Sequence, residues 1–136
     1  MMNHLECLIY ISRSRLDRSA LPPAIEDIVA VSSFRNREAG ITGILTCHDD
    51  CFIQMLEGAP AALDLLMIHL HFDERHNDIR VVARQPIMGK AALTWAMAAP
   101  ADNHPLRAEL GKMIERPPGT VAPWRNILLE MVTEPA

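Results

Sequence analysis

The sequence has little of what several large classes of protein require. Its 136 residues include only three cysteines. None lies in a Cys-x-x-Cys pair or near a spaced pair of histidines, so neither a zinc site nor a disulfide framework is predicted. No run of about eighteen apolar residues is present that could cross a bilayer. The net charge of −4 argues against a nucleic-acid-binding surface, because phosphate contacts need concentrated positive charge.

The amino terminus also lacks an export signal. Residues 1–6 show no basic stretch followed by an apolar segment and a small-residue cleavage site, so we expect a cytoplasmic protein without membrane attachment. The chain is long enough for one domain and too short for two cores of ordinary size. Hydrophobic residues make up 49% and charged residues 22% of it, which is typical of a globular protein.

Hydrophobic patterning predicts an alternating order of strands and helices. The expected elements are strands at 7–12, 41–47, 51–57, 79–87 and 92–98 and helices at 22–39 and 60–70. Gly40 ends the first helix, and Pro60 lies in the first turn of the second. The order βαββαββ predicts a ferredoxin-like α+β fold, with one mixed sheet and two helices on one of its faces.

The other face of this sheet also carries apolar side chains. Side chains alternate along a strand, so Ile9 and Met55, with their same-parity neighbours, point away from the two helices. Such a patch in water requires a cover. Two tail segments with apolar stripes, residues 104–115 and 121–132, or a second copy of the chain are the candidates to cover it.

Three polar residues interrupt apolar segments and are candidates for chemistry. Tyr10 and Gln54 lie in the first and third strands, and a buried phenol or amide requires partners. If these strands are neighbours, both side chains project onto the helix-covered face, where Asn36 shares a helical stripe with Ile28. Taken singly, each polar residue can be a satisfied core group or, for Asn36, a helix cap. Their combination is what points to a function.

The residues around these three resemble the BLUF family, sensors of blue light that use flavin adenine dinucleotide, in its short single-domain type. The resemblance covers about residues 5–98. Besides Tyr10 and Asn36 it is carried by Gly40-Ile41-Thr42-Gly43-Ile44-Leu45, Gln54-Met55-Leu56-Glu57-Gly58, Asp73-Glu74-Arg75-His76 and Trp95-Ala96-Met97. It implies a flavin-binding sensor domain over residues 1–100 and a C-terminal helical extension over residues 101–136 that packs on the sheet.

The resemblance further implies a flavin ring between the two helices. Ile28 and Leu70 would lie on its two sides and Asn36 at its pyrimidine edge, while Gln54 would stand between Tyr10 and the N5/C4=O edge. The other residues implied to contact the cofactor are Arg35 beside the ring, His69 and Arg75 near the phosphates, and Asp73 and His76 next to them. The implied cofactor is FAD, with FMN or riboflavin as substitutes in vitro.

The implied mechanism is photochemical, without catalytic turnover. Light would drive an electron and a proton from Tyr10 to the flavin, and Gln54 would rotate or tautomerise to form a new hydrogen bond to the flavin C4=O. Trp95 and Met97 in the last strand would pass this change to the sheet face. The signal would then reach a separate partner protein, or act through a change in a homodimer or larger oligomer.

Two other functions stay open at this point. Ferredoxin-like domains of this size include acyl phosphate hydrolases, and Arg35 or Arg75 with Asn36 could imitate their arginine and asparagine. A protein-interaction or small-ligand module without a chromophore is the third possibility. Both predict a colourless protein, whereas bound oxidised flavin is yellow. Glu57 and Asp73 could also be paired carboxylates, but no nucleophile accompanies them.

Overall fold

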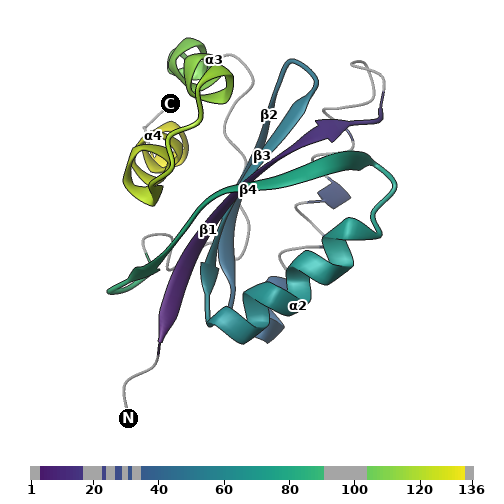
Figure 1. Cartoon of the computed structure of the whole chain (residues 1–136), viewed down its shortest axis with the longest axis vertical. Helices are drawn as coiled ribbons and strands as arrows, with labels where there is room; N and C mark the ends of the chain where they lie inside the picture. The colour runs from purple at the N-terminus through teal and green to yellow at the C-terminus, as the bar shows by residue number, and fades with distance from the viewer. Residues whose placement is uncertain are drawn as a thin grey trace.

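One sheet separates two helical layers. The computed structural model describes residues 4–16, 35–90 and 104–133, together with positions 23, 27, 28 and 31. The sheet has the order β2-β3-β1-β4 and consists of β1 (Leu5–Ser14), β2 (Thr42–His48), β3 (Cys51–Gly58) and β4 (His76–Ile87). Helix α2 (Pro60–His71) lies on one side of the sheet, and α3 (Arg107–Glu115) and α4 (Val121–Thr133) lie together on the other (Figure 1). This is the predicted ferredoxin-like α+β arrangement.

The described strands pair only in the antiparallel sense. All three pairings, β1 with β3, β1 with β4 and β2 with β3, are antiparallel, where the sequence predicted a mixed sheet. The fifth strand expected at 92–98 lies outside the described residues. Strand β4 begins earlier than predicted, because the long β1 provides a partner for it as far as Ser14, which pairs with His76.

The breaks between elements lie where backbone chemistry favours them. Gly40 has a φ of 71°, which glycine adopts without steric cost, and it follows helical residues 35–39. Asp49, with a φ of 54°, makes the turn between β2 and β3, and a short polar side chain tolerates this conformation. Pro60 begins α2. Proline's missing N–H costs no hydrogen bond there, because the N–H groups of the first turn have no partner within the helix.

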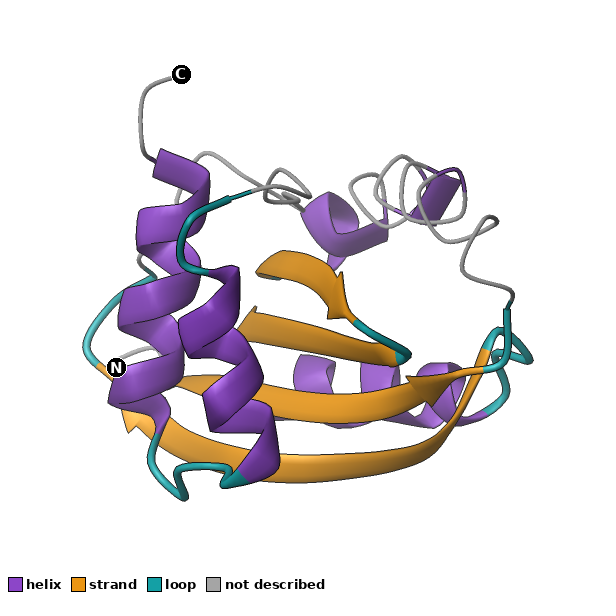
Figure 2. Ribbon diagram, turned by 90° about the horizontal axis from the view of Figure 1, so that it is seen from above, coloured by secondary structure: helices purple, strands orange, loops and turns teal. Residues whose placement is uncertain are grey.

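Alternation along the strands divides the core in two. Leu8, Tyr10 and Phe52 pack with Leu63 of α2 and with Ile28, which lies in the helical part before β2. We call the face of the sheet that carries Leu8, Tyr10 and Phe52 the slot face. Figure 2 shows α3 and α4 on one side of the strands and α2 on the other.

The opposite side, the tail face, is covered by the chain's own carboxyl-terminal helices. Its buried core includes Ile9, Ile11, Ile53, Met55, Leu110, Val121, Trp124, Leu128 and Met131. The predicted tail stripes thus pack on the sheet, and Val121 and Trp124 extend the second stripe toward its amino end. The indole N–H of Trp124 donates to the Pro118 carbonyl at 3.0 Å, so the one polar atom of this buried side chain has a hydrogen-bond partner. None of the described helices combines the length and apolarity needed to span a bilayer.

Candidate functional site

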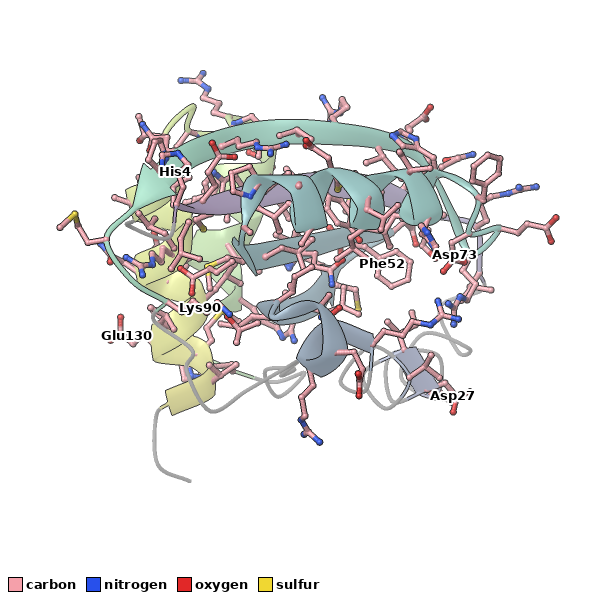
Figure 3. The ribbon with its side chains drawn as sticks, turned by 90° about the horizontal axis from the view of Figure 1, so that it is seen from below. His4, Asp27, Phe52, Asp73, Lys90 and Glu130 are labelled. Carbon is pink, nitrogen blue, oxygen red and sulfur yellow. The ribbon has the colours of Figure 1, made fainter. Side chains whose placement is uncertain are left out.

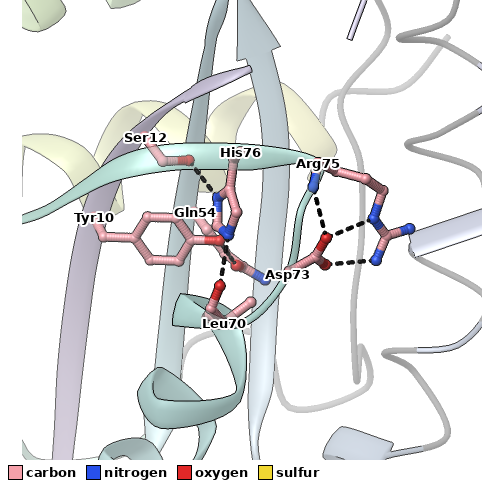
Figure 4. Close-up of polar contacts among 7 residues, drawn as sticks. All are labelled: Tyr10, Ser12, Gln54, Leu70, Asp73, Arg75 and His76. Carbon is pink, nitrogen blue, oxygen red and sulfur yellow. Dashed lines mark hydrogen bonds and ion pairs between the residues drawn. The ribbon is translucent and has the colours of Figure 1, made fainter. Parts of the chain in front are cut away.

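Tyr10 and Gln54 meet on the slot face. Strands β1 and β3 are antiparallel neighbours, and their register places these two residues directly opposite each other. The side chains are buried, with 2% and 3% of their residues' surface exposed. The Tyr10 hydroxyl donates a hydrogen bond to Gln54 Oε1, as Figure 4 shows. The buried phenol and amide therefore satisfy each other in part.

Burial keeps Tyr10 protonated. Its pKa is raised above the ordinary value of a phenol, first by desolvation and then by the negative charge of Asp73, against which the charge of Arg75 acts weakly. A charged phenolate would lose its hydration without an equivalent replacement. The group beside Gln54 is therefore a neutral hydrogen-bond donor at every physiological pH.

Because Tyr10 is the only tyrosine, its ionisation can be followed directly. We expect the folded protein to show no phenolate absorbance at the pH, about 10, where the phenol of the urea-unfolded chain is half ionised. The raised folded-state pKa stabilises the fold fully below the unfolded pKa. The unfolding free energy should fall as pH rises above about 10, because the unfolded chain then releases its proton first. Ionisation near pH 10 with native circular dichroism would contradict this.

His76 connects β1, β4 and α2 beside this pair. Its Nδ1 lies 2.7 Å from Ser12 Oγ and its Nε2 lies 2.8 Å from the Leu70 carbonyl oxygen. A carbonyl only accepts, so Nε2 carries a proton and donates, and in the neutral ring Nδ1 accepts from the Ser12 hydroxyl. The imidazole centroid is 6.1 Å from that of Tyr10. His76 thereby holds the backbone of Leu70 on the slot face, close to Tyr10.

Asp73 and Arg75 form a local ion pair at the end of α2. Arg75 Nε and Nη2 donate to the two oxygens of Asp73 at 2.9 and 2.6 Å, and the Arg75 backbone N–H adds a bond of 3.0 Å. These hydrogen bonds lower the pKa of Asp73 and raise that of Arg75. The guanidinium is thus held in a fixed orientation, with one edge given to Asp73 (Figure 4).

A single pocket brings the predicted residues together. Every cofactor-contacting residue proposed from the sequence lines it, namely Tyr10, Ile28, Arg35, Asn36, Gln54, His69, Leu70, Asp73, Arg75 and His76. Asn36 is 2% exposed. Its backbone carbonyl accepts a hydrogen bond from the Ile41 N–H at 2.8 Å, which ties helical residues 35–39 to the start of β2. Figure 3 shows Phe52 and Asp73 on the side of α2 that faces Asp27.

Four residues that were not predicted from the sequence also line the pocket, namely Val31, Leu45, Phe52 and Leu66. Simple periodicity could have found them. Phe52 lies two residues before Gln54 on the same strand face, and Leu66 lies one helical turn before Leu70. Leu45 is directly opposite Gln54 in the β2–β3 register. Trp95 and Met97 lie outside the described residues.

The donor set of this pocket fits a flavin. A flavin ring is flat and apolar on its faces, and it carries hydrogen-bonding groups along one edge. Ile28 and Leu70 supply apolar side chains from two helical segments, while Gln54 and Asn36 supply amides that both donate and accept. Arg75 supplies the permanent positive charge that suits phosphate oxygens.

The pattern of a family described as BLUF, sensors of blue-light using FAD, matches residues 5–98. This chain belongs to the BLUF family. The family is one of flavin-binding blue-light sensors, and the match includes every residue of β1, β2, β3, α2 and β4. The tail helices α3 and α4 lie beyond it.

Individual relatives agree with this assignment. The β subunit of photoactivated adenylate cyclase from Euglena gracilis is 32% identical over 94 residues, which are 69% of this chain and 11% of that protein. The chain thus spans about a tenth of this relative. The dark-state structure of BlrB, a BLUF protein, superposes with a TM-score of 0.77 at 30% identity, covering 93% of this chain and 96% of BlrB. BlrP1 of Klebsiella pneumoniae, in a structure with FMN and cyclic diGMP, gives 0.67 at 29% identity, covering 82% and 30%.

Proposed function

We propose that this protein is a blue-light photoreceptor whose response is carried by Tyr10 and Gln54, with FAD bound in the pocket on the slot face. The observation that carries the proposal is the hydrogen bond from the buried Tyr10 hydroxyl to Gln54 Oε1 in a pocket whose donor set fits a flavin. The flavin, when bound, supplies the light absorption and the electron acceptor.

The residues around the pocket have distinct roles in this proposal. Ile28 and Leu70 hold the two faces of the ring, and Asn36 holds its pyrimidine edge. Arg35 lies beside the ring, and Arg75 faces the phosphate end together with His69. Asp73 orients Arg75 through its two hydrogen bonds, and His76 fixes Leu70 through its carbonyl. The last two are therefore positioning residues.

Tyr10 and Gln54 together form the light-sensitive element. Light would drive an electron and the hydroxyl proton together from Tyr10 to the bound flavin, since the raised pKa of Tyr10 keeps this phenol protonated beforehand. Loss of that proton would remove the Tyr10 donor to Gln54 Oε1, and the amide would then rotate or tautomerise and make a new hydrogen bond toward the ring. Electron and proton then return to Tyr10, and only the hydrogen-bond pattern has changed.

The change reverses in the dark, since one neutral hydrogen bond contributes only about 1 kcal/mol net. No substrate is consumed, and the protein signals without turnover. Residues 1–100 form the sensor and residues 101–136 the extension that receives the change. Trp95 and Met97 pass the change to this extension, which in turn contacts a separate cytoplasmic effector or a second copy of the chain. The acyl phosphate hydrolase alternative is disfavoured, because the chain belongs to a family of flavin-binding blue-light sensors.

The proposal is tested by the colour and light response of the purified protein. We expect FAD to bind at about one per chain, and its absorption band to shift to longer wavelength under blue light and return in darkness. FMN and riboflavin should support the same shift, because the response needs only the ring. A protein that binds flavin without any reversible shift would contradict the proposal, and a colourless protein with acyl phosphatase activity would favour the alternative.

A further inference from the structure

Helix α3 is attached to the end of β2 by one arginine. Arg107, the first residue of α3, donates from Nη1 to the Cys47 carbonyl and from Nη2 to the Thr46 hydroxyl at 2.9 Å. The planar guanidinium thus binds two consecutive residues of β2 in one fixed orientation. Helix α4 is attached elsewhere, through Arg125 and Glu57 of β3. Each tail helix therefore has its own polar contact with the sheet.

A second contact lies one helical turn further along α3. Gly111 packs so closely against the His48 ring that a Cβ added to this glycine would lie 2.6 Å from His48 Nε2. Glycine is unfavourable inside a helix, and the close approach of the ring explains its presence. Arg107 and Gly111 share one face of α3, because residues four apart lie above one another. We call their contacts with Thr46, Cys47 and His48 the α3–β2 contact.

The same end of β2 adjoins the flavin pocket. Leu45 directly precedes Thr46, lines the pocket and lies opposite Gln54 in the β2–β3 register. Side chains that face each other across antiparallel strands are in contact range, with about 5 Å between their Cβ atoms. A rotation of the Gln54 amide would therefore act on Leu45, and the next residue along β2 is the one that accepts from Arg107.

We propose that Arg107 is a positioning residue of the light response, which couples α3 to Gln54 through Leu45. The inference rests on the proposed function and goes beyond it, because it assigns a contact through which the tail responds to the pocket. This contact is separate from the last strand, to which the proposed function gives the transfer of the signal.

The direction of the coupling follows from the hydrogen bonds that occur together. The α3–β2 contact is formed while the Tyr10 hydroxyl donates to Gln54 Oε1, so it belongs to the dark pattern, and the lit pattern loosens it. Coupling between two sites is reciprocal. Weakening the α3–β2 contact therefore favours the lit pattern.

The test follows the FAD-loaded full chain in darkness and under blue light. It measures hydrogen exchange of the α3 amides and the lifetime of the red-shifted state. In the unchanged protein we expect light to speed this exchange. Thr46→Val keeps the shape of the side chain but removes the acceptor, so exchange should be fast already in darkness. Its absorption shift should remain, and the red-shifted state should last about fivefold longer, the effect of one hydrogen bond present in only one of two states.

Variants of Arg107 separate its hydrogen bonds from its general effect on the helix. Arg107→Met should lengthen the lifetime further than Thr46→Val, because it removes both bonds to β2. Arg107→Lys keeps a donor for the Cys47 carbonyl and should reverse part of this change. Arg116→Met is the matched control, because Arg116 is an exposed arginine directly after α3. It should leave both the exchange and the lifetime as they are in the unchanged protein.

The outcomes distinguish this inference from the proposed function. Equal α3 exchange in darkness and light in the unchanged protein would overturn the coupling, even with a normal absorption shift. So would a lifetime in Thr46→Val that is unchanged or shorter. An equally long lifetime in Arg116→Met would show that any lost charge near α3 has this effect, and would remove the role of Arg107. If the unchanged protein showed no shift under blue light, the proposed function itself would fail, and this inference with it.

Discussion

Replacing Tyr10 with phenylalanine is expected to abolish the light-induced absorption shift while the flavin stays bound. The phenyl ring fills the same space between β1 and α2, but it has no hydroxyl to donate to Gln54 Oε1. Phenylalanine therefore cannot supply the proton that accompanies the electron transfer at the start of the response. Absorption spectra before and after blue light should therefore superimpose for Tyr10→Phe.

The variant should still fold. Loss of the hydrogen bond leaves the buried Gln54 oxygen with fewer partners, a change that costs about 1–3 kcal/mol. Flavin content measured after gel filtration separates loss of photochemistry from loss of cofactor. Ser12→Ala is the matched control, because Ser12 lies next along the same face of β1 and donates to His76 rather than to Gln54. It should keep the shift. A normal shift in Tyr10→Phe would remove Tyr10 from the mechanism.

The meeting of Tyr10 and Gln54 was predictable because it depends on local rules. Alternation fixes which residues of a strand share a face, and the short turn at Asp49 fixes the β2–β3 register. The neighbouring position of β1 and β3 follows from the fold class. The resemblance to a family of flavin sensors then supplied the roles of residues that physical patterns alone leave open, such as Asn36.

Contacts between side chains far apart in sequence were not predictable in the same way. His76 bridges Ser12 and the Leu70 carbonyl, which depends on how β4 begins after α2, and the sequence placed that start three residues late. The sequence leaves Glu57 open as a carboxylate partner of Asp73, but the two lie on opposite sides of the sheet, Glu57 against Arg125 of α4 and Asp73 in the pocket on the slot face. Counting alternate residues from Gln54 already places Glu57 on the tail face, and this signal was available.

Glu57 instead binds the tail helix, and this contact carries the second large prediction. Arg125 Nε of α4 lies 2.8 Å from Glu57 Oε2, and the Glu57 side chain is fully buried. Arg125 Nη2 also donates to the Gly89 carbonyl at 2.6 Å. Nearby, burial and then the charge of Glu57 raise the pKa of the Cys7 thiol to about 12. One guanidinium thus joins the sheet, the end of β4 and α4.

Arg125→Met is expected to lower the free energy of unfolding by about 3 kcal/mol, because it removes the positive charge of Arg125 from beside the buried Glu57 carboxylate. Urea denaturation followed by the fluorescence of the buried Trp124 measures this change. Lys112→Met is the control, since Lys112 and Glu109 are both exposed and 3.4 Å apart, and such pairs contribute less than about 1 kcal/mol.

The double variant Glu57→Leu, Arg125→Met decides whether the loss comes from the stranded charge. A buried ion pair replaced by apolar residues of similar volume often costs nothing, so the double variant should regain most of the stability lost in Arg125→Met. If it were less stable than Arg125→Met, the contact would contribute through packing of the arginine stem rather than through charge. Recovery would mean that the pair contributes orientation rather than net stability, and that it acts with the bond from the Val121 N–H to Gln85 Oε1 in placing α4 on the sheet.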